Sequence, residues 1–331
     1  MVLNIAILGF GTVGRATYEI LEEKKSEIEK IIKREIKLKK ILVRNLQKYS
    51  GEKNFEIFTD KIEEIIADDE IELIIELTGE VDKMIEPMKT ALSKRKNIIT
   101  ANKALVSKYM EELEEISKKY DSKICYEAAV AGGIPIIYPL EKIVALNDVE
   151  SIEGVLNGTC NFILSKMEEK KSYEEALKEA QRIGFAESDP TADVKGFDTM
   201  RKLRILSTIA FGKSVKEEEI SLEGITEIKL PDIEKAAQKN MRYKLLASAK
   251  IEKGKIRASV KPTEVSKDSI IGSLKGGENA VIIKASNVGE LVFKGLGAGG
   301  RPTAFSVLSD FLNIYGNLPM SLLDALMGVK L

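Results

Sequence analysis

Histidine and tryptophan are both missing from this chain of 331 residues, and cysteine occurs only twice. Without histidine, any proton transfer has to use lysine, aspartate, glutamate, tyrosine or cysteine side chains. The same absence excludes nucleophiles that a histidine activates and metal sites with histidine ligands. Cys125 and Cys160 are too few for a disulfide framework in a chain of this length. Because neither has a histidine partner, we expect both to be small buried hydrophobic residues.

The chain also lacks long apolar runs and an excess of charge of either sign. No run of about 18 apolar residues occurs, so we expect no membrane span. The 51 basic and 52 acidic residues leave a net charge of −1, which argues against a nucleic-acid partner. The N-terminal residues read as a strand and lack the basic region of a signal peptide, so we expect a cytoplasmic protein. The length suggests two domains.

Apolar strand patterns alternate with helical patterns through the first 130 residues. This alternation predicts parallel βαβ units, and hence the α/β class with a Rossmann-type doubly wound parallel sheet. Strands are predicted at residues 4–8, 36–43, 71–77, 97–100 and 123–129. Helices are predicted from the first glycine turn to about residue 32 and at 60–67, 81–95 and 108–120, with Thr59 as the N-cap of the second.

From about Gly132 the pattern becomes α+β. Ser172 and Glu175 form a capping box that opens a helix, and Gly184 would end it. Short turns join two pairs of strand-like segments, which predicts antiparallel hairpins. The strands are expected at 242–251, 256–265, 280–286 and 290–296, and helices at 198–211 and 303–315. We therefore predict a dinucleotide-binding domain of residues 1–130, completed by a C-terminal helix within 301–331, and an inserted domain of residues 131–300.

A glycine motif follows the first strand and opens the first helix. It consists of Gly9, Phe10, Gly11, Thr12, Val13 and Gly14. In this context Gly9 permits a tight turn, Gly11 lets the backbone approach a pyrophosphate, and Gly14 lets the helix pack on the strand. The helix N-terminus would then face the phosphates. A glycine-rich turn without a ligand is the alternative.

The second strand ends in a basic residue. NAD-binding domains usually carry an acid there, which binds the adenosine ribose, whereas an arginine suits the 2′-phosphate of NADP. This chain has Arg44 at that place, with Lys48 close behind. The pattern favours NADP over NAD, and the alternative is that Arg44 simply lies in solvent.

Two further strand ends carry residues that the fold alone does not explain. Ligands of such sheets bind at the carboxyl ends of the strands. The fourth strand is followed by Thr78 and Gly79, and the fifth by Asn102 and Lys103. A lysine at a helix start is unfavourable for the helix dipole, so we predict a functional role for Lys103.

An acid-rich stretch, residues 184–202, ends in a lysine. Asp198 and Lys202 are four residues apart and share one helix face with Ile205 and Ile209, while Arg204 points elsewhere. An acid and an amine in line with an apolar stripe should be partly withdrawn from water. The alternative is an ordinary ion pair on an exposed helix face.

Seven segments, in this order, resemble the homoserine dehydrogenase family along essentially the whole chain. They are residues 9–14, 76–79, 100–106, 126–135, 156–161, 184–202 and 297–303. The resemblance implies interconversion of L-homoserine and L-aspartate 4-semialdehyde by hydride transfer with NAD(P), in threonine, methionine and isoleucine biosynthesis. It also implies that the inserted domain binds the substrate and forms a homodimer.

The resemblance carries roles to individual residues. It places Lys202, Lys103 and Asp198 at the reacting oxygen and Glu187 at the substrate's amino group. The remaining substrate contacts would be Asn157, Gly158, Thr159 and Asp193, and Gly299 joins the coenzyme-binding set. A sodium site would use Glu127 and the carbonyl groups of Val130, Gly132 and Ile134. For that last segment, an ordinary Gly-Gly turn before Pro135 is the alternative.

The chain departs from many members of the family at its end. Those members carry a regulatory extension or are fused to aspartate kinase, whereas this sequence stops at Leu331. We therefore expect a short form without threonine regulation. Two other interpretations compete with this one. The first is another Rossmann dehydrogenase, of the sugar or diaminopimelate type, and many sugar-type members carry Glu-Lys-Pro in place of residues 102–104. A non-catalytic NAD(P)H sensor would not need the acid-rich stretch.

Overall fold

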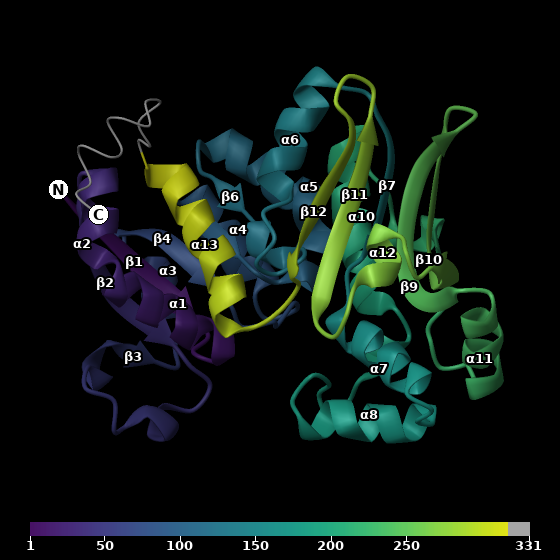
Figure 1. The fold of residues 1–331 in the computed structure, drawn as a ribbon. Helices are drawn as coiled ribbons and strands as arrows, with labels where there is room; N and C mark the ends of the chain where they lie inside the picture. Colours follow the sequence, from purple (N-terminus) through teal and green to yellow (C-terminus); the bar gives the residue numbers. More distant parts are fainter. Residues whose placement is uncertain (317–331) are drawn as a thin grey trace. The chain divides into compact units, whose positions relative to one another are not determined.

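The computed structural model describes residues 1–316, and these divide into two compact units. The first comprises Met1–Ala129 with residues 299–316, and the second comprises Val130–Ala298 (Figure 1). Part of the C-terminal helix predicted within residues 301–331 is present as α13 (Gly300–Tyr315). Residues 317–331 of that prediction lie outside the described residues.

The first unit contains a six-stranded parallel sheet of order β3-β2-β1-β4-β5-β6. Its strand order reverses beside β1, which confirms the predicted doubly wound sheet and puts the switch point at the carboxyl ends of β1 and β4. The strands are β1 (Val2–Leu8), β2 (Glu35–Leu42), β3 (Phe58–Thr59), β4 (Ile71–Glu76), β5 (Asn97–Thr100) and β6 (Ile124–Cys125).

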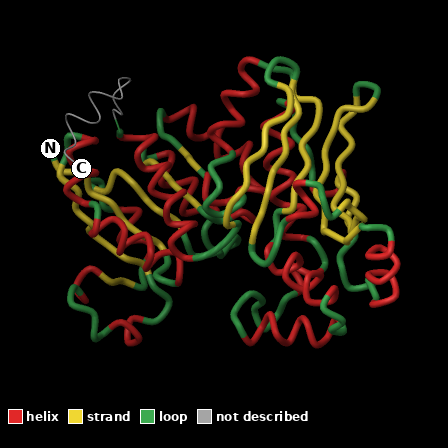
Figure 2. The backbone as a smooth tube through the Cα atoms, viewed as in Figure 1, coloured by secondary structure: helices red, strands yellow, loops and turns green. Residues whose placement is uncertain are grey.

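Both faces of this sheet are buried, as the continuous apolar strands require. Ala6 and Leu8 of β1 pack with one set of helices, whereas Ile5 and Ile7 belong to the core on the other face. Figure 2 shows the helices in red beside the yellow strands. With α13 they are α1 (Thr12–Glu23), α2 (Lys25–Ile32), α3 (Ile62–Ala67), α4 (Ile85–Ser93) and α5 (Lys103–Tyr120).

Several predicted boundaries in this unit were wrong. The first helix is interrupted at Lys24, which separates α1 from α2. Thr59 is not a helix N-cap. It belongs to β3, and Lys61 is the residue that precedes α3. The hydroxyl of Thr59 instead accepts the Lys61 N–H at 3.2 Å and bonds to Glu64. The helix predicted at 81–95 is shorter, since α4 starts only at Ile85.

Two other boundaries have a clear local cause. α5 starts at Lys103 rather than residue 108 because the side chain of Asn102 accepts the Leu105 N–H at 3.1 Å and caps the helix. The strand predicted at 123–129 covers only Ile124–Cys125. Beyond it, the N–H of Glu127 donates to Asp310 of α13 at 2.9 Å, and the chain turns as a 3₁₀ helix.

The second unit is built on a sheet of order β12-β11-β7-β9-β10-β8. The two predicted hairpins are confirmed as β9–β10 and β11–β12. The strands are β7 (Val149–Val155), β8 (Ile220–Leu222), β9 (Met241–Glu252), β10 (Lys255–Ser266), β11 (Glu278–Ala285) and β12 (Gly289–Leu296). The helices are α6 (Ile137–Leu146), α7 (Gly158–Glu168), α8 (Tyr173–Arg182), α9 (Thr191–Val194), α10 (Phe197–Phe211), α11 (Leu230–Gln238) and α12 (Ile270–Ser273).

Strand β7 was not predicted, although it joins the two hairpins. Besides buried Val149 and Val155 at its two ends, its sequence mixes Glu150, Ser151 and Glu153 with one apolar inward residue, Ile152. A glycine follows on the same face, where a Cβ at Gly154 would lie 2.6 Å from a carbonyl oxygen of β11. The central strand therefore has small and polar residues where an apolar run would be expected.

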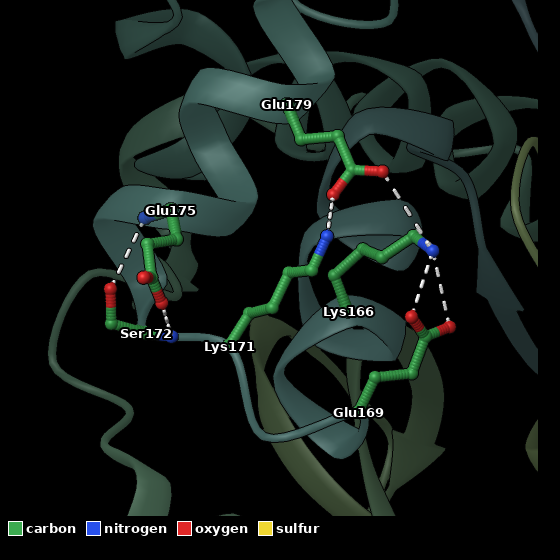
Figure 3. Close-up of polar contacts among 6 residues, drawn as sticks. All are labelled: Lys166, Glu169, Lys171, Ser172, Glu175 and Glu179. Atoms are coloured by element: carbon green, nitrogen blue, oxygen red, sulfur yellow. Dashed lines mark hydrogen bonds and ion pairs between the residues drawn. The ribbon is translucent and has the colours of Figure 1, made fainter.

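The turn between α7 and α8 is fixed by a polar network (Figure 3). The predicted capping box is confirmed: Ser172 accepts the Glu175 N–H at 3.2 Å, and Glu175 accepts the Ser172 N–H at 2.8 Å. Glu179 bridges Lys171 and Lys166, and its hydrogen bond from Lys171 lowers the pKa of its carboxyl group. The groups are half-buried or exposed at the surface, so their main effect is to set the geometry of the turn.

Candidate active site

The glycine turn of the first unit leaves room for a ligand. A Cβ at Gly9 (φ +95°) would lie 2.8 Å from the Leu77 carbonyl oxygen, and one at Gly14 would lie 2.1 Å from the Gly9 carbonyl oxygen. Both positions therefore exclude side chains through packing. A Cβ at Gly11 would meet nothing within 4 Å. The protein's own packing does not demand glycine there, but an approaching ligand would.

The N-terminus of α1 lies at this turn and is not capped. Gly11 is its N-cap without a side-chain hydrogen bond, and its first turn has no acidic residue, so the N–H groups at Thr12 and Val13 can meet an anion. The loop before α13 reaches this turn, because a Cβ at Gly300, next to Gly299, would lie 3.1 Å from Thr12. These residues fit the pyrophosphate of a dinucleotide.

Phe10 has a different role from its neighbours in the motif. Its ring is buried and packs edge-on against Tyr18, Tyr49 and Phe58. Its carbonyl oxygen accepts the hydroxyl of Tyr49 at 3.2 Å. The side chain of Phe10 thus belongs to the core.

Arg44 lies just beyond β2 with 84% of its side chain exposed, and it forms an ion pair with Glu80 at 3.3 Å. Glu80 follows the Thr78–Gly79 turn at the end of β4. Asn102 links the next strand end to the same segment, since its Nδ2 donates to the Glu80 carbonyl oxygen at 2.9 Å. Lys103 is then the first residue of α5. The predicted residues at the ends of β2, β4 and β5 therefore meet at one edge of the sheet.

In the second unit the acid–lysine pair of α10 is buried. Asp198 is 3% exposed and Lys202 is 8% exposed, so the alternative of a solvated surface pair is wrong. Within the described chain the Lys202 ammonium donates to Asp198 Oδ2 at 2.8 Å and to the Leu156 carbonyl oxygen at 2.7 Å. Arg204 is buried too, which the helix-face prediction missed. The helix α10 is therefore buried on more of its surface than the apolar stripe alone.

Asn157 joins the acids of this unit. Its Nδ2 donates to Asp193 Oδ1 at 2.7 Å and to Asp198 Oδ2 at 2.9 Å. Its Oδ1 accepts the Cys160 N–H at 2.8 Å and caps α7. The amide nitrogen thus holds the two carboxylates next to each other, and one of them, Asp198, also accepts from the Lys202 ammonium.

The start of α7 forms another wall of the same site. A Cβ at Gly158 would lie 3.2 Å from Gly277, and the Thr159 hydroxyl donates to the Phe185 carbonyl oxygen at 2.6 Å. Glu187 lies in the exposed loop that follows, held through its carbonyl oxygen by Gln181 at 3.2 Å. Within residues 1–316 its carboxylate makes no hydrogen bond or ion pair, so it can accept a ligand's ammonium group.

The two cysteines differ in environment. Cys160 is fully buried and donates its thiol to the Asp193 carbonyl oxygen at 3.2 Å. Burial, with Asp193 and Asp198 nearby, raises the pKa of the thiol well above its usual value, so it is not a nucleophile. Cys125 is half-buried, and the expectation that both cysteines are buried is wrong for it.

The segment expected to bind sodium is buried. Val130, Gly132 and Ile134 lie in a tight turn, and Gly132 has φ +57°. Within residues 1–316 the carbonyl oxygens of Val130 and Ile134 accept no protein hydrogen bond. The carboxylate of Glu127 lies three residues earlier and is also buried.

Comparison with known proteins agrees with this architecture. The family profile described as homoserine dehydrogenase matches residues 135–312, and the homoserine dehydrogenase NAD-binding domain matches residues 9–127. The chain belongs to the homoserine dehydrogenase family. It is therefore an oxidoreductase of amino-acid biosynthesis that acts on homoserine and L-aspartate 4-semialdehyde with a nicotinamide coenzyme.

Individual relatives extend over most of this chain. The homoserine dehydrogenase of Lactococcus lactis is 41% identical over 322 residues, which are 95% of this chain and 74% of that protein. A solved homoserine dehydrogenase from Thiobacillus denitrificans is 37% identical with a TM-score of 0.91, covering 95% of this chain and 73% of that one. A hyperthermophilic archaeal homoserine dehydrogenase mutant in complex with NADPH is 31% identical with a TM-score of 0.81. The match covers 96% of this chain and 100% of that one.

Sequence reasoning missed several buried groups in and around the candidate site of this homoserine dehydrogenase. The carbonyl groups of Leu156 and Phe185 bind Lys202 and Thr159, and backbone acceptors have no sequence signal. Lys244 on β9 is 1% exposed, and its amine donates to Asn161 and, at 2.7 Å, to the Leu274 carbonyl oxygen. The only sign of this in the sequence is that Lys244 interrupts an apolar strand. The carboxylate of Glu76 was likewise visible only as an acid that interrupts an apolar run.

No helix among residues 1–316 combines the length and the apolar character that crossing a membrane would need.

Proposed function

We propose that Lys202 and Lys103 manage the proton of the reacting oxygen during interconversion of homoserine and aspartate semialdehyde. The observation that carries this proposal is the geometry of Lys202. An ammonium group has three donors, and within residues 1–316 this one uses two of them, on Asp198 and Leu156. The third is available for a substrate oxygen. Asp198 orients Lys202, and Asn157 holds Asp198 in turn.

The chemistry requires such a group. When homoserine is oxidised, its hydroxyl group loses a proton as hydride leaves the same carbon, and the bound coenzyme would accept that hydride. A lysine that touches the oxygen in its neutral amine form can take this proton and become an ammonium group, while the ammonium group of a second lysine stabilises the developing alkoxide. We assign the second cation to Lys103 at the first position of α5. In the reverse direction the same groups return the proton.

The charged ends of the amino acid have matching partners in the second unit. The α-amino group would meet the carboxylate of Glu187, and Asp193 adds a second negative charge beside Asn157. The α-carboxylate would meet the N-terminus of α7 at Gly158 and Thr159, where the first turn has no acidic residue. This distribution favours a small zwitterionic substrate.

We further propose that the coenzyme is NADP rather than NAD. The exposed guanidinium group of Arg44 at the end of β2 supports this, because it can exchange its weak ion pair with Glu80 for a 2′-phosphate. The archaeal relative crystallised with NADPH is a precedent. The coenzyme-binding set would be Gly9, Phe10 through its backbone, Gly11, Thr12, Val13, Gly14, Arg44, Thr78, Gly79, Asn102, Lys103 and Gly299.

Replacing Arg44 by alanine tests the coenzyme proposal. We expect KM for NADP to rise about tenfold or more and KM for NAD to change less than about twofold, because only NADP carries the 2′-phosphate. Steady-state kinetics with both coenzymes measure this, with Arg15→Ala as control, since Arg15 pairs with Glu52. A wild-type enzyme that prefers NAD, or equal losses for both coenzymes, would contradict the proposal.

A sodium ion would fit the turn 130–134. Buried carbonyl groups without hydrogen bonds need a partner, and the unbonded oxygens of Val130 and Ile134 suit a hard monovalent cation. Gly132 and the buried carboxylate of Glu127 complete the donor set. Activity should therefore depend on added sodium or potassium, and rates that are identical with and without these ions would refute a functional site.

The enzyme is proposed to act as a cytoplasmic homodimer in threonine, methionine and isoleucine biosynthesis. The strand register aligns Glu153, Ile282 and Val292 across β7, β11 and β12 on one sheet face, where Val292 is exposed. A second copy of this face could cover it. Sedimentation equilibrium should give twice the chain mass, and a monomer at micromolar concentration would exclude this.

The proposed cytoplasmic location is supported by the two free cysteines, which suit a reducing compartment. Cell fractionation can check it.

A further inference from the structure

Glu76 is a buried acid to which the mechanism gives no role. It is the last residue of β4 and is 0% exposed. Among residues 1–316 it pairs with no lysine or arginine. Its Oε1 accepts the N–H of Thr78 at 2.8 Å and the hydroxyl of the same residue at 2.6 Å, and its Oε2 accepts the Thr100 hydroxyl at 2.6 Å. A carboxylate without a cation in the core requires such donors, because burying it is costly.

The position of Glu76 lets it join two strand ends. In the parallel register it pairs with Leu8 of β1 on one side and with Thr100 of β5 on the other. It therefore sits at the carboxyl edge of the sheet, beside the switch point where ligands of such sheets bind. One oxygen holds the Thr78–Gly79 turn after β4, and the other holds the segment after β5.

The hydrogen bonds continue from Thr100 to the start of α5. The hydroxyl of Thr100 accepts the Asn102 N–H at 3.0 Å while it donates to Glu76. Asn102 then caps α5 through Leu105 and returns to the β4 loop through the Glu80 carbonyl oxygen. Lys103 follows Asn102 directly. The direction in which α5, and with it Lys103, leaves the sheet thus depends on a chain of bonds that begins at Glu76.

A glutamine could not replace this carboxylate without loss. Both oxygens of Glu76 act as acceptors, whereas an amide offers one acceptor and one donor. With the amide nitrogen toward Thr100, the hydroxyl proton of that residue loses its acceptor. With the amide nitrogen toward Thr78, the N–H and the hydroxyl group of that residue, which both donate to Glu76, would face another donor. The change keeps size and shape but breaks one of the two strand-end contacts.

We infer that Glu76 is a positioning residue, which fixes the coenzyme loop at Thr78–Gly79 and the catalytic Lys103 relative to each other. This inference rests on the roles proposed above for Lys103 and the coenzyme loop. A purely structural brace is the competing explanation. It would lower stability without a specific effect on coenzyme binding or on the contribution of Lys103.

The test is Glu76→Gln, with Glu72→Gln as the matched control. Glu72 lies on the same strand, at its other end, where it pairs with Arg34. We expect Glu76→Gln to lower kcat about tenfold and to raise the NADPH dissociation constant about threefold or more, at little change in KM for homoserine. Glu72→Gln should leave kcat and NADPH affinity within about twofold of wild type. A folded Glu76→Gln enzyme with wild-type values overturns the inference.

A double-variant cycle separates positioning from general stability. If Glu76 acts through Lys103, Glu76→Gln should change kcat less than about twofold in a Lys103→Ala background. If the double variant instead loses kcat by the product of the two single losses, Glu76 does not act through Lys103, and that part of the inference is overturned. If Lys103→Ala alone keeps wild-type kcat, the proposed role of Lys103 fails, and the NADPH dissociation constant still decides on Glu76.

If Glu76→Gln does not fold, Thr100→Val breaks the same chain of hydrogen bonds, and Thr100→Ser should restore it. An active Thr100→Val enzyme with wild-type NADPH affinity overturns the inference.

Discussion

Lys202→Met is expected to lower kcat by about 100-fold or more, in both directions of the reaction. Methionine keeps the apolar volume of the lysine side chain on α10 but removes the ammonium group that bonds to Asp198 and Leu156. Lys103→Ala should have an effect of similar size, because the proposed mechanism gives both lysines a part in handling the proton and the alkoxide charge.

The main risk in this experiment is instability, since removing one member of a buried ion pair leaves the other charge uncompensated. Asp198 keeps its hydrogen bond from Asn157, which limits this cost. Urea unfolding should therefore accompany the kinetics. Arg201→Met is the matched control, because Arg201 lies on the same helix but faces Glu217 at 3.9 Å. Near-normal turnover in both lysine variants would refute the mechanism.

The second large effect is a pH dependence of stability caused by Lys244. Burial, the largest cause, lowers the pKa of its amine from 10.5 to about 8, and Arg242 adds to this. Glu168 and Glu278 act in the opposite direction. Between pH 8 and 10.5 the unfolded chain binds the proton that the folded chain has lost. Stability therefore rises with pH in this window, and the penalty below pH 8 is ~3 kcal/mol.

The comparison of wild type with Lys244→Met isolates this effect from other titrating groups. We expect the free energy of unfolding of wild type, minus that of the variant, to be constant below about pH 8. It should then increase by ~3 kcal/mol up to pH 10.5. Urea titrations at a series of pH values measure it. A difference that stays flat across this window would show that the folded protein does not lower the pKa of Lys244.

The sequence predicted features that depend on local spacing. The glycine motif needs a particular turn, and the structure has Gly9 and Gly14 where a Cβ would collide with backbone. The helix spacing of Asp198 and Lys202 likewise predicted a pair withdrawn from water, and both are buried. The roles proposed for the site residues came from the family resemblance, whereas spacing alone predicted only the turn and the buried pair.

Features that depend on distant contacts could not be predicted. β7 is a central strand because hairpins from later in the chain pair with both its edges, and its own residues look polar. Arg204 was expected outside the apolar stripe, yet neighbouring elements cover it. In the sequence, Glu76 was visible only as an acid that interrupts an apolar strand. Its hydrogen bond from Thr100 of β5 is seen only in the folded sheet. For β7 and Glu76 the partners lie far away in sequence.

The most direct test of the central claim is the initial rate of the wild-type enzyme with both substrates and both coenzymes. The account predicts NADPH oxidation that requires L-aspartate 4-semialdehyde, and NADP reduction that requires L-homoserine at alkaline pH, with higher kcat/KM for the phosphorylated coenzyme. A folded protein that binds NADPH but shows no homoserine-dependent reduction of either coenzyme would contradict it.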